Sequence, residues 1–150
     1  MKVSAKVEFG IAAIIDIALY SELGEAVTVY SIAKRQNISS KYLEQIITVL
    51  RQANLIRGLK GSKGGYVIAR PTDKITFKEI INALDVTILN DMTYYGEEKD
   101  SEMIKTINDN LWGKMTSYLQ DFAQNITLAE MTDIYRNSKE NQAQEFMYYI

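Results

Sequence analysis

Residues 39–70 decide the fold, and they read SSKYLEQIITVLRQANLIRGLKGSKGGYVIAR. In the first part of this stretch, up to about Ala53, apolar residues recur at the spacing of one helix face: Leu43, Ile46, Ile47 and Leu50. The opposite face carries polar side chains with no acid among them: Lys41, Gln45, Thr48 and Gln52. Ser39 or Ser40 can cap this helix by accepting a hydrogen bond from one of its first free N–H groups.

The second part, residues 57–70, holds four Lys or Arg and four Gly but no acid. Residues 55–59 and 66–70 predict two strands, and the loop between them contains Gly61, Gly64 and Gly65, which permit a left-handed backbone. Such a loop could be a solvated hairpin tip, a phosphate cradle or a finger for a polyanion. A Walker-type phosphate loop is excluded, because its glycines lead into a helix, whereas a strand follows here.

A short helix is predicted before this stretch, opening at Thr28 with Ile32 and Ala33 facing inward, and residues 37–39 predict a turn. Two short helices joined by a tight turn are typical of a helix-turn-helix, and the hairpin that follows is then its wing. In this setting Lys60 and Lys63 at the tip favour a polyanion, because cations and backbone N–H groups can contact phosphates.

The flanking segments predict a mainly α fold with a small β wing. Apolar stripes indicate a first helix before Gly24 and a helix opening at Thr76, where Glu79 completes a capping box. Thr127 and Glu130 have the same spacing and predict a second capping box, which opens a short helix. A long helix is expected over about residues 101–124. Its apolar seam outruns what the small domain can cover, which favours a partner helix over packing on the chain's own domain. The seam consists of Ile104, Ile107, Leu111, Trp112, Met115, Leu119 and Phe122.

We therefore expect four parts: a winged helix-turn-helix DNA-binding domain over 1–86, a loop over 87–100, the dimerisation helix with a short following helix over 101–137, and a C-terminal tail over 138–150. The charge is divided in a similar way. Residues 1–75 carry 11 Lys or Arg against 6 Asp or Glu, and residues 76–150 carry 6 against 13. A basic half of this kind can meet nucleic acid, an acidic protein or a membrane surface.

The 150-residue chain contains neither Cys nor His. The lack of Cys excludes disulfides and thiolate chemistry, and the lack of His removes the commonest general base and metal ligand. We therefore expect neither an enzyme nor a metal site. No apolar run approaches the roughly 18 residues of a membrane span, and no signal peptide is predicted, so we expect a cytoplasmic protein without membrane contact.

Three stretches resemble a known family: MKVSAKVEFG at residues 1–10, the quoted stretch at 39–70, and LW at 111–112 together with YLQDFAQNITLAEM at 118–131. Over about residues 1–135 the chain resembles the winged-helix transcription regulators of the IscR, NsrR and CymR type, the Rrf2 family. The resemblance implies a homodimer that crosses at the long helix, binds a pseudo-palindromic operator in double-stranded DNA and usually represses transcription.

Many members of this family bind an iron–sulfur cluster through three cysteines that precede the long helix, often with a histidine as the fourth ligand. The matching residues 90–105 contain no cysteine, and Asp109 or its neighbours stand where the histidine is expected. Thiolates are the ligands that hold such clusters. We therefore expect no cluster and no other cofactor. Val7 and Glu8 also differ from the Gly-Arg pair that relatives often carry.

The last five residues, FMYYI at 146–150, resemble the end of the cluster-free, cysteine-metabolism branch of the family. That branch represses sulfur-uptake and cysteine-synthesis genes together with cysteine synthase. The resemblance implies that the end of the chain docks in that enzyme through Tyr148, Tyr149 and Ile150. The alternative is an apolar tail that packs on the dimer.

For DNA we expect the start of the recognition helix to enter the major groove, through Ser39, Ser40, Lys41, Tyr42 and Gln45. Lys2 and Thr28 are candidate phosphate contacts, and the wing is expected to use Lys60, Ser62 and Lys63. Two other functions stay open. One is a cluster-free regulator of another pathway that senses a small molecule, and the other is a protein-interaction adaptor built on the winged domain.

Overall fold

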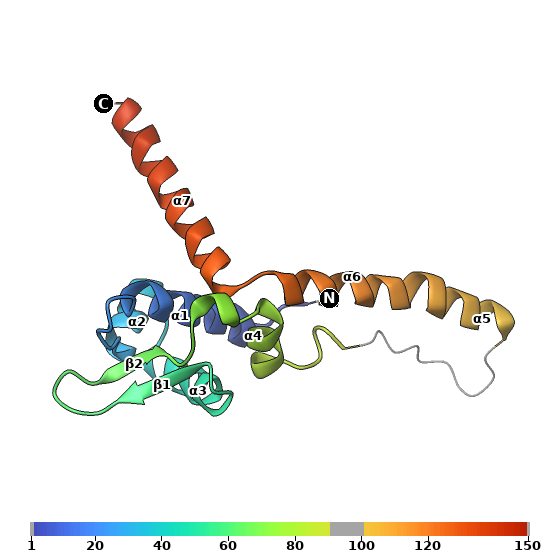
Figure 1. Ribbon diagram of the computed structural model, residues 1–150, viewed down its shortest axis with the longest axis horizontal. Coiled ribbons are helices and arrows are strands. Elements are labelled where there is room, and N and C mark those ends of the chain that lie inside the picture. Colours follow the sequence, from blue (N-terminus) through green and yellow to red (C-terminus); the bar gives the residue numbers. More distant parts are fainter. Residues whose placement is uncertain (1, 91–100, 150) are drawn as a thin grey trace.

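The computed structural model describes residues 2–90 and 101–149, which form a mainly helical fold with a small antiparallel sheet (Figure 1). This confirms the predicted fold class. In chain order the elements are α1 (Ala5–Tyr20), α2 (Val29–Gln36), α3 (Ser40–Gln52), β1 (Ile56–Leu59), β2 (Gly65–Ile68), the 3-10 turn η1 (Thr72–Lys74), α4 (Phe77–Leu84), α5 (Glu102–Ile107), the π-helical turn η2 (Asn108–Trp112), α6 (Gly113–Asn125) and α7 (Leu128–Tyr148).

Side-chain caps set the boundaries of the helix-turn-helix formed by α2 and α3. The Thr28 hydroxyl accepts a hydrogen bond from the Ser31 N–H at 3.1 Å and opens α2. The helix ends at Asn37, whose φ of 54° is a left-handed conformation that asparagine tolerates. The Ser39 hydroxyl then accepts from the Tyr42 N–H at 3.2 Å, so the first of the two candidate serines caps α3.

A core of aliphatic side chains joins α1, α2, α3, the hairpin and α4. Leu128, the first residue of α7, lies in the same core and is fully buried. The C-terminal half of the chain is therefore anchored in the winged domain. The largest fully buried side chains are Ile14, Ile17, Ile32, Leu43, Ile46, Ile47, Leu50, Leu55, Ile56, Ile75, Ile80 and Leu128.

The wing is fastened to the helix-turn-helix by its second strand. β1 and β2 pair antiparallel, with Ile56 opposite Ile68. The backbones of Val27, before α2, and Tyr66 exchange two N–H···O bonds of 2.9 and 2.8 Å. At Gly65, where φ is 149°, a Cβ would lie 2.6 Å from the Val27 carbonyl oxygen. Glycine is therefore required for this close approach.

A second short backbone pairing joins the starts of α4 and α7. The Phe77 N–H donates to the Ile126 carbonyl at 2.9 Å, and the Leu128 N–H donates to the Ile75 carbonyl at 2.8 Å. The residues between these bonds are the two N-caps, Thr76 and Thr127, and each opens its helix with a complete capping box. Both boxes were predicted, whereas their pairing was not.

The C-terminal half differs from the expectation in two respects. The long helix predicted over 101–124 is interrupted by η2, so α5 and α6 are separated by one wider turn. The helix after Thr127 is not short, because α7 runs without a break to Tyr148 and contains neither proline nor glycine. The expected polar tail is therefore the outer half of a helix. Figure 1 shows α7 leaving the body in a different direction from α6.

Candidate nucleic-acid interface

A buried carboxylate fixes the helix-turn-helix against α1. The Asp16 side chain is fully buried and accepts hydrogen bonds from Arg35 Nε at 2.9 Å, Arg35 Nη2 at 2.7 Å and Gln36 Nε2 at 2.8 Å. The Arg35 guanidinium also lies 3.9 Å from the centre of the Tyr20 ring. The hydrogen bond to Asp16 raises the pKa of Arg35 above its ordinary value, although burial opposes the shift. Asp16 and Tyr20 of α1 and Arg35 and Gln36 of α2 thus hold the helix-turn-helix against α1.

The predicted groove-reading residues fall into two groups at the start of α3. Ser40, Lys41 and Gln45 are exposed, and no hydrogen bond or ion pair holds their side chains within the described residues. The other two are already engaged. The Ser39 hydroxyl caps the helix, and the half-buried Tyr42 ring packs edge-on against Phe9 at 6.0 Å between centroids.

The sequence-based expectation omitted two exposed residues near this surface. Glu44 lies between Lys41 and Gln45 on α3 and is exposed, and a carboxylate can accept a hydrogen bond from a cytosine amino group. Tyr30, in the first turn of α2, is 71% exposed and can donate its hydroxyl to a phosphate. The sequence offered one signal for Tyr30, because it is an aromatic residue that does not belong to the inward-facing pair Ile32 and Ala33 of the same short helix.

The three predicted wing residues, Lys60, Ser62 and Lys63, are all exposed in the loop between β1 and β2. Their side chains make no hydrogen bond or ion pair within residues 2–90 and 101–149. Figure 1 shows this loop extending beyond the rest of the domain. The tip is therefore a free cationic projection on the same side of the core as α3.

The two candidate phosphate contacts lie in different places. Thr28 is exposed at the start of α2, but its hydroxyl already accepts the capping hydrogen bond from Ser31. Lys2 is exposed ahead of α1, and Figure 1 places the N-terminus at the end of α1 that is remote from the hairpin tip. The structure thus does not group Lys2 with the wing.

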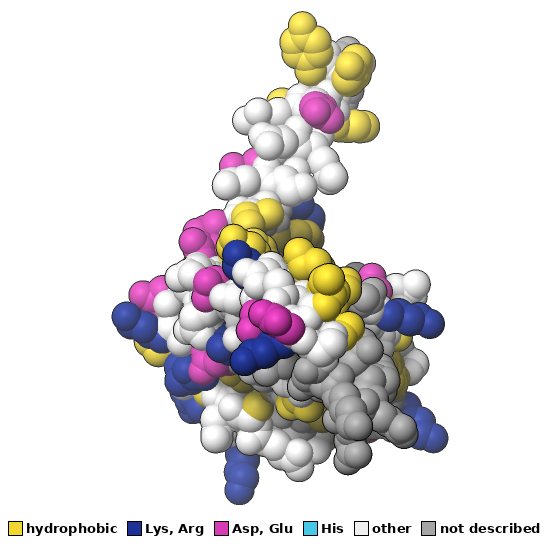
Figure 2. Space-filling model, turned by 90° about the vertical axis from the view of Figure 1, so that its right-hand side faces the viewer, with side chains coloured by type: hydrophobic (Ala, Val, Ile, Leu, Met, Phe, Trp, Pro, Cys, Tyr) yellow, Lys and Arg dark blue, Asp and Glu magenta, His cyan; other side chains and the backbone are white. Residues whose placement is uncertain are grey.

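The helical segment from α5 to α6 carries a face of exposed apolar side chains (Figure 2). Trp112 is 41% exposed, Met115 46%, Leu111 55% and Phe122 61%. The remaining predicted seam residues, Ile104, Ile107 and Leu119, are half-buried. Leu119 and Phe122 also line an apolar groove of about 240 Å³ whose other walls come from Val3, Val7, Ile11, Phe77, Ile81, Ile88, Leu89 and Ala123.

The end of α7 carries a second exposed apolar group, visible at the top of Figure 2. Phe146 is 70% exposed, Met147 75%, and Tyr148 and Tyr149 87% each. The two tyrosine rings lie edge-on to one another, with 6.0 Å between their centroids. The third residue of the predicted docking end, Ile150, lies outside the described residues.

Comparison with known proteins identifies a family and several relatives with this architecture. A model of the Rrf2 family, described as an iron-dependent transcriptional regulator, matches residues 3–134. The chain is 34% identical over 135 residues to the HTH-type transcriptional regulator IscR of Vibrio parahaemolyticus, covering 89% of this chain and 79% of that one. The fold of T. potens IscR superposes with a TM-score of 0.73 at 36% identity, covering 99% of this chain and 97% of that one. CymR, the global cysteine regulator of B. subtilis, superposes with a TM-score of 0.77 at 28% identity, and the match covers 89% of this chain and 98% of that one.

The iron dependence in the family description does not fit the donor groups of this chain. Thiolates and imidazoles are the usual protein ligands of iron–sulfur clusters, and the sequence has no Cys and no His. Within the described residues there is also no group of three or more carboxylates that could hold a metal ion. None of the described helices combines the length and apolar content that a membrane crossing requires.

The helix-turn-helix, the fastened wing and the long helices agree with the family match over most of the chain. The relatives are named as transcription regulators, which is a non-enzymatic role. This chain belongs to the Rrf2 family of DNA-binding transcription regulators.

Proposed function

We propose that this chain is a homodimeric repressor that binds a pseudo-palindromic DNA operator. The observation that carries the proposal is the pairing of two free polar surfaces on one core. The exposed start of α3, with Ser40, Lys41 and Gln45, has the size and chemistry to enter a major groove. The wing tip offers Lys60 and Lys63 to the phosphates beside it.

The exposed face of α5 and α6 supports the homodimer. Leu111, Met115 and Phe122 would be shielded from water against a second copy of the same helix. The adjoining groove of about 240 Å³ is lined only by apolar side chains, so it suits an apolar side chain of the partner. A two-fold dimer of this kind presents two recognition helices, which is why its operator would be pseudo-palindromic.

For the regulated pathway, we propose sulfur and cysteine metabolism, with cysteine synthase as the partner. The exposed end of α7 supports this proposal, because Tyr148 and Tyr149 make no contact with the body of the chain and remain free to dock. The similarity to CymR, which is named a global cysteine regulator, also supports it. The similarity to IscR favours a second candidate, a cluster-free regulator of another pathway.

Substitutions in the wing and in the recognition helix should affect DNA binding in different ways. Replacing Lys60 and Lys63 by alanine should weaken binding to every sequence and reduce the salt slope by about 0.9 for each phosphate that is no longer neutralised. Gln45→Ala should instead change sequence preference, by about 1–3 kcal/mol at one base pair for a good base contact. Lys74→Ala removes an exposed cation of η1 outside this surface and serves as the control.

The measurement is fluorescence anisotropy with a labelled operator, obtained by genomic footprinting, at several salt concentrations. Genomic footprinting also names the bound genes and so separates the cysteine pathway from the alternatives. An unchanged salt slope in the double lysine variant would show that the wing does not touch DNA. Failure of the wild-type protein to bind any footprinted sequence would favour the adaptor function.

The docking end is tested with a peptide of residues 141–150 titrated into cysteine synthase by calorimetry. An apolar anchor with a free carboxylate suits capture in a nest of backbone N–H groups. We expect binding that O-acetylserine, the substrate of the enzyme, competes away. A peptide of residues 141–149, which lacks Ile150, is the control and should bind at least about tenfold more weakly. No binding by the longer peptide would leave the partner unidentified.

A further inference from the structure

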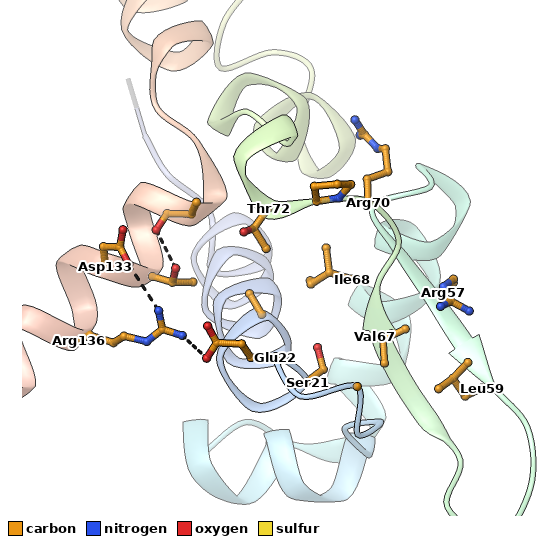
Figure 3. A pocket seen from close by; sticks show the side chains of 15 residues that line it. Ser21, Glu22, Arg57, Leu59, Val67, Ile68, Arg70, Thr72, Asp133 and Arg136 are labelled. Carbon is orange, nitrogen blue, oxygen red and sulfur yellow. Dashed lines mark hydrogen bonds and ion pairs between the residues drawn. The ribbon is translucent and has the colours of Figure 1, made fainter.

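A cavity of about 520 Å³ opens where the wing, the end of α1 and the start of α7 meet (Figure 3). Its volume lies within the range of roughly 300–1,000 Å³ that is typical of small-molecule sites. Its walls come from the turn after α1, from both strands of the hairpin, from η1 and from the first turns of α7. The dimer face on α6 and the exposed start of α3 contribute no residue to it.

The helix side of the cavity carries an excess of negative charge. Arg136 donates to Glu22 Oε2 at 2.7 Å and lies 3.4 Å from Asp133 Oδ1, so two carboxylates share one guanidinium. One oxygen of each carboxylate stays without a protein partner within the described residues. All three side chains are well exposed, so a ligand can reach them.

The hairpin side carries the complementary charge. Arg57, on β1, is exposed, and its side chain makes no hydrogen bond or ion pair with any other described residue. Arg70, which also lines the cavity, is in contrast held by Glu79 at 2.9 Å and by the Lys74 carbonyl at 3.3 Å. Arg57 is therefore the free cation of this wall.

An apolar floor separates the two charged sides. Figure 3 shows Glu22 and Arg136 to one side, Arg57 to the other, and Val67 and Ile68 between them. Val67 is buried and Ile68 is half-buried. The cavity thus presents a cation, a hydrocarbon surface and an anionic pair in succession.

We propose that this cavity binds a short zwitterion, a small peptide or an ω-amino acid, whose ammonium and carboxylate groups lie at opposite ends of a hydrocarbon segment. The carboxylate of the ligand would accept hydrogen bonds from Arg57, a planar donor that matches a carboxylate with two parallel bonds. Its ammonium group would donate to the free oxygens of Glu22 and Asp133. Its hydrocarbon part would cover Val67 and Ile68. A ligand with only one of the two charges would leave half of these groups unsatisfied.

Occupancy of the cavity would connect the wing to α7. Arg57 belongs to the hairpin, whereas Asp133 belongs to α7, so a bridging ligand favours conformations in which these two elements are close. The operator affinity should then change with ligand concentration. This second step rests on the proposed DNA-binding function, whereas the binding site itself does not.

The test is performed on the full-length protein without DNA, by calorimetric titration with γ-aminobutyrate, ε-aminocaproate, dialanine and trialanine, one at a time. At least one of these probes should bind with a Kd below about 1 mM. Acetate and ethylammonium, which each carry one of the two charges, should bind at least about tenfold more weakly than that probe. If no probe binds at about 10 mM, the proposed site is overturned.

Charge-neutral variants locate the binding. Arg57→Gln and Glu22→Gln should each raise the Kd about tenfold, since each removes one charge-assisted contact. Arg51→Gln makes the same change on an exposed arginine of α3 outside the cavity and should leave the Kd unaltered. Circular dichroism confirms that the variants are folded. Equal binding by Arg57→Gln and the wild-type protein would place the ligand elsewhere and overturn the assignment.

The DNA-linked step is tested separately, by repeating the operator titration with a saturating concentration of the tightest probe. A change in operator affinity that Arg57→Gln removes supports the coupling. A probe that binds without altering operator affinity overturns the coupling and leaves the site intact. Absence of operator binding by the wild-type protein would contradict the proposed function but would not affect the calorimetric result.

Discussion

At the scale of single residues, two glycines of the wing have similar backbones and different surroundings. Gly61 and Gly65 both have positive φ, 111° and 149°, in which other L-residues are strained. A Cβ on Gly61 would meet nothing within 4 Å, whereas a Cβ on Gly65 would lie 2.6 Å from the Val27 carbonyl oxygen. Substitution of Gly61 therefore tests backbone strain alone, whereas substitution of Gly65 tests the same strain together with steric overlap against Val27.

Both Gly61→Ala and Gly65→Ala should lower the free energy of unfolding by about 1–2 kcal/mol through backbone strain. Gly65→Ala should cost about a further 1–3 kcal/mol, because the added methyl group forces Val27 and Tyr66 apart and breaks their backbone bonds. Urea denaturation of both variants measures the difference. If the two variants are destabilised equally, the close approach at Val27 is unimportant.

Contacts between residues that are close in the sequence could be predicted, whereas contacts between distant residues could not. The capping boxes at Thr76 and Thr127 were predictable, since each joins a hydroxyl residue to a glutamate three positions later. The hydrogen-bonded ion pair between Asp16 and Arg35 could not be predicted, because Arg35 is 19 positions away and belongs to another helix. Nothing in the local pattern around Asp16 fixes the crossing of α1 and α2 on which the contact depends.

At the scale of elements, the contacts of Asp16 with Arg35 and Gln36 determine how the helix-turn-helix packs on α1. Asp16 is fully buried and is matched by donors from Arg35 and Gln36. The Arg35 side chain keeps 31% of its surface exposed, so the buried carboxylate is the partner for which a lost hydrogen bond cannot be replaced by water. The ion pair between Arg136 and Asp133 is exposed on both sides and gives a comparison in which water can take the place of the missing partner.

Asp16→Asn should lower the free energy of unfolding by about 1–3 kcal/mol, because one of the two buried acceptor oxygens becomes an NH2 group that cannot accept the hydrogen bonds of Arg35 and Gln36. Asp133→Asn, at the exposed pair, should cost less than about 1 kcal/mol. Both are measured by urea denaturation at neutral pH. Similar destabilisation of the two variants would mean that burial of Asp16 adds nothing to the pair.

The order of the elements was predictable from the sequence, whereas the ends of the C-terminal helices were not. Periodicity and caps located α1 to α4 and the hairpin, because each buries an apolar stripe in one core. Outside the first turns of α7 that stripe is missing, since residues 137–149 are exposed and only helix propensity extends the helix. The turn η2 also escaped prediction, because π-helical turns are rare and nothing in the local sequence pattern singles one out.

At the scale of the whole molecule, the chain has one shared core and two projecting helical arms. α6 and α7 leave the core in different directions and expose apolar side chains along the first arm and at the end of the second (Figure 1, Figure 2). The seam on α6 was visible in the sequence as a heptad-like repeat. The length of the seam favoured a partner helix, but periodicity alone does not say which chain supplies that helix.

A charge placed at an exposed position of α6 can test the proposed dimer without disturbing the fold of the single chain. Met115 is 46% exposed, so an aspartate at this position stays hydrated in a single chain and leaves the core of the winged domain unchanged. In the proposed dimer the same carboxylate would be buried without a partner, at a cost of several kcal/mol. Ser117→Asp places the same charge on an exposed polar position of α6 and is the matched control.

We expect Met115→Asp to be a folded monomer by light scattering and circular dichroism, and Ser117→Asp to remain a dimer. Operator affinity should fall at least about a hundredfold in Met115→Asp, because two half-sites are no longer bound by one linked particle. Binding to a single half-site should change little, since the recognition helix and the wing are untouched. A dimeric Met115→Asp, or a wild-type protein that is monomeric at about micromolar concentration, would place the two-fold contact somewhere other than α6.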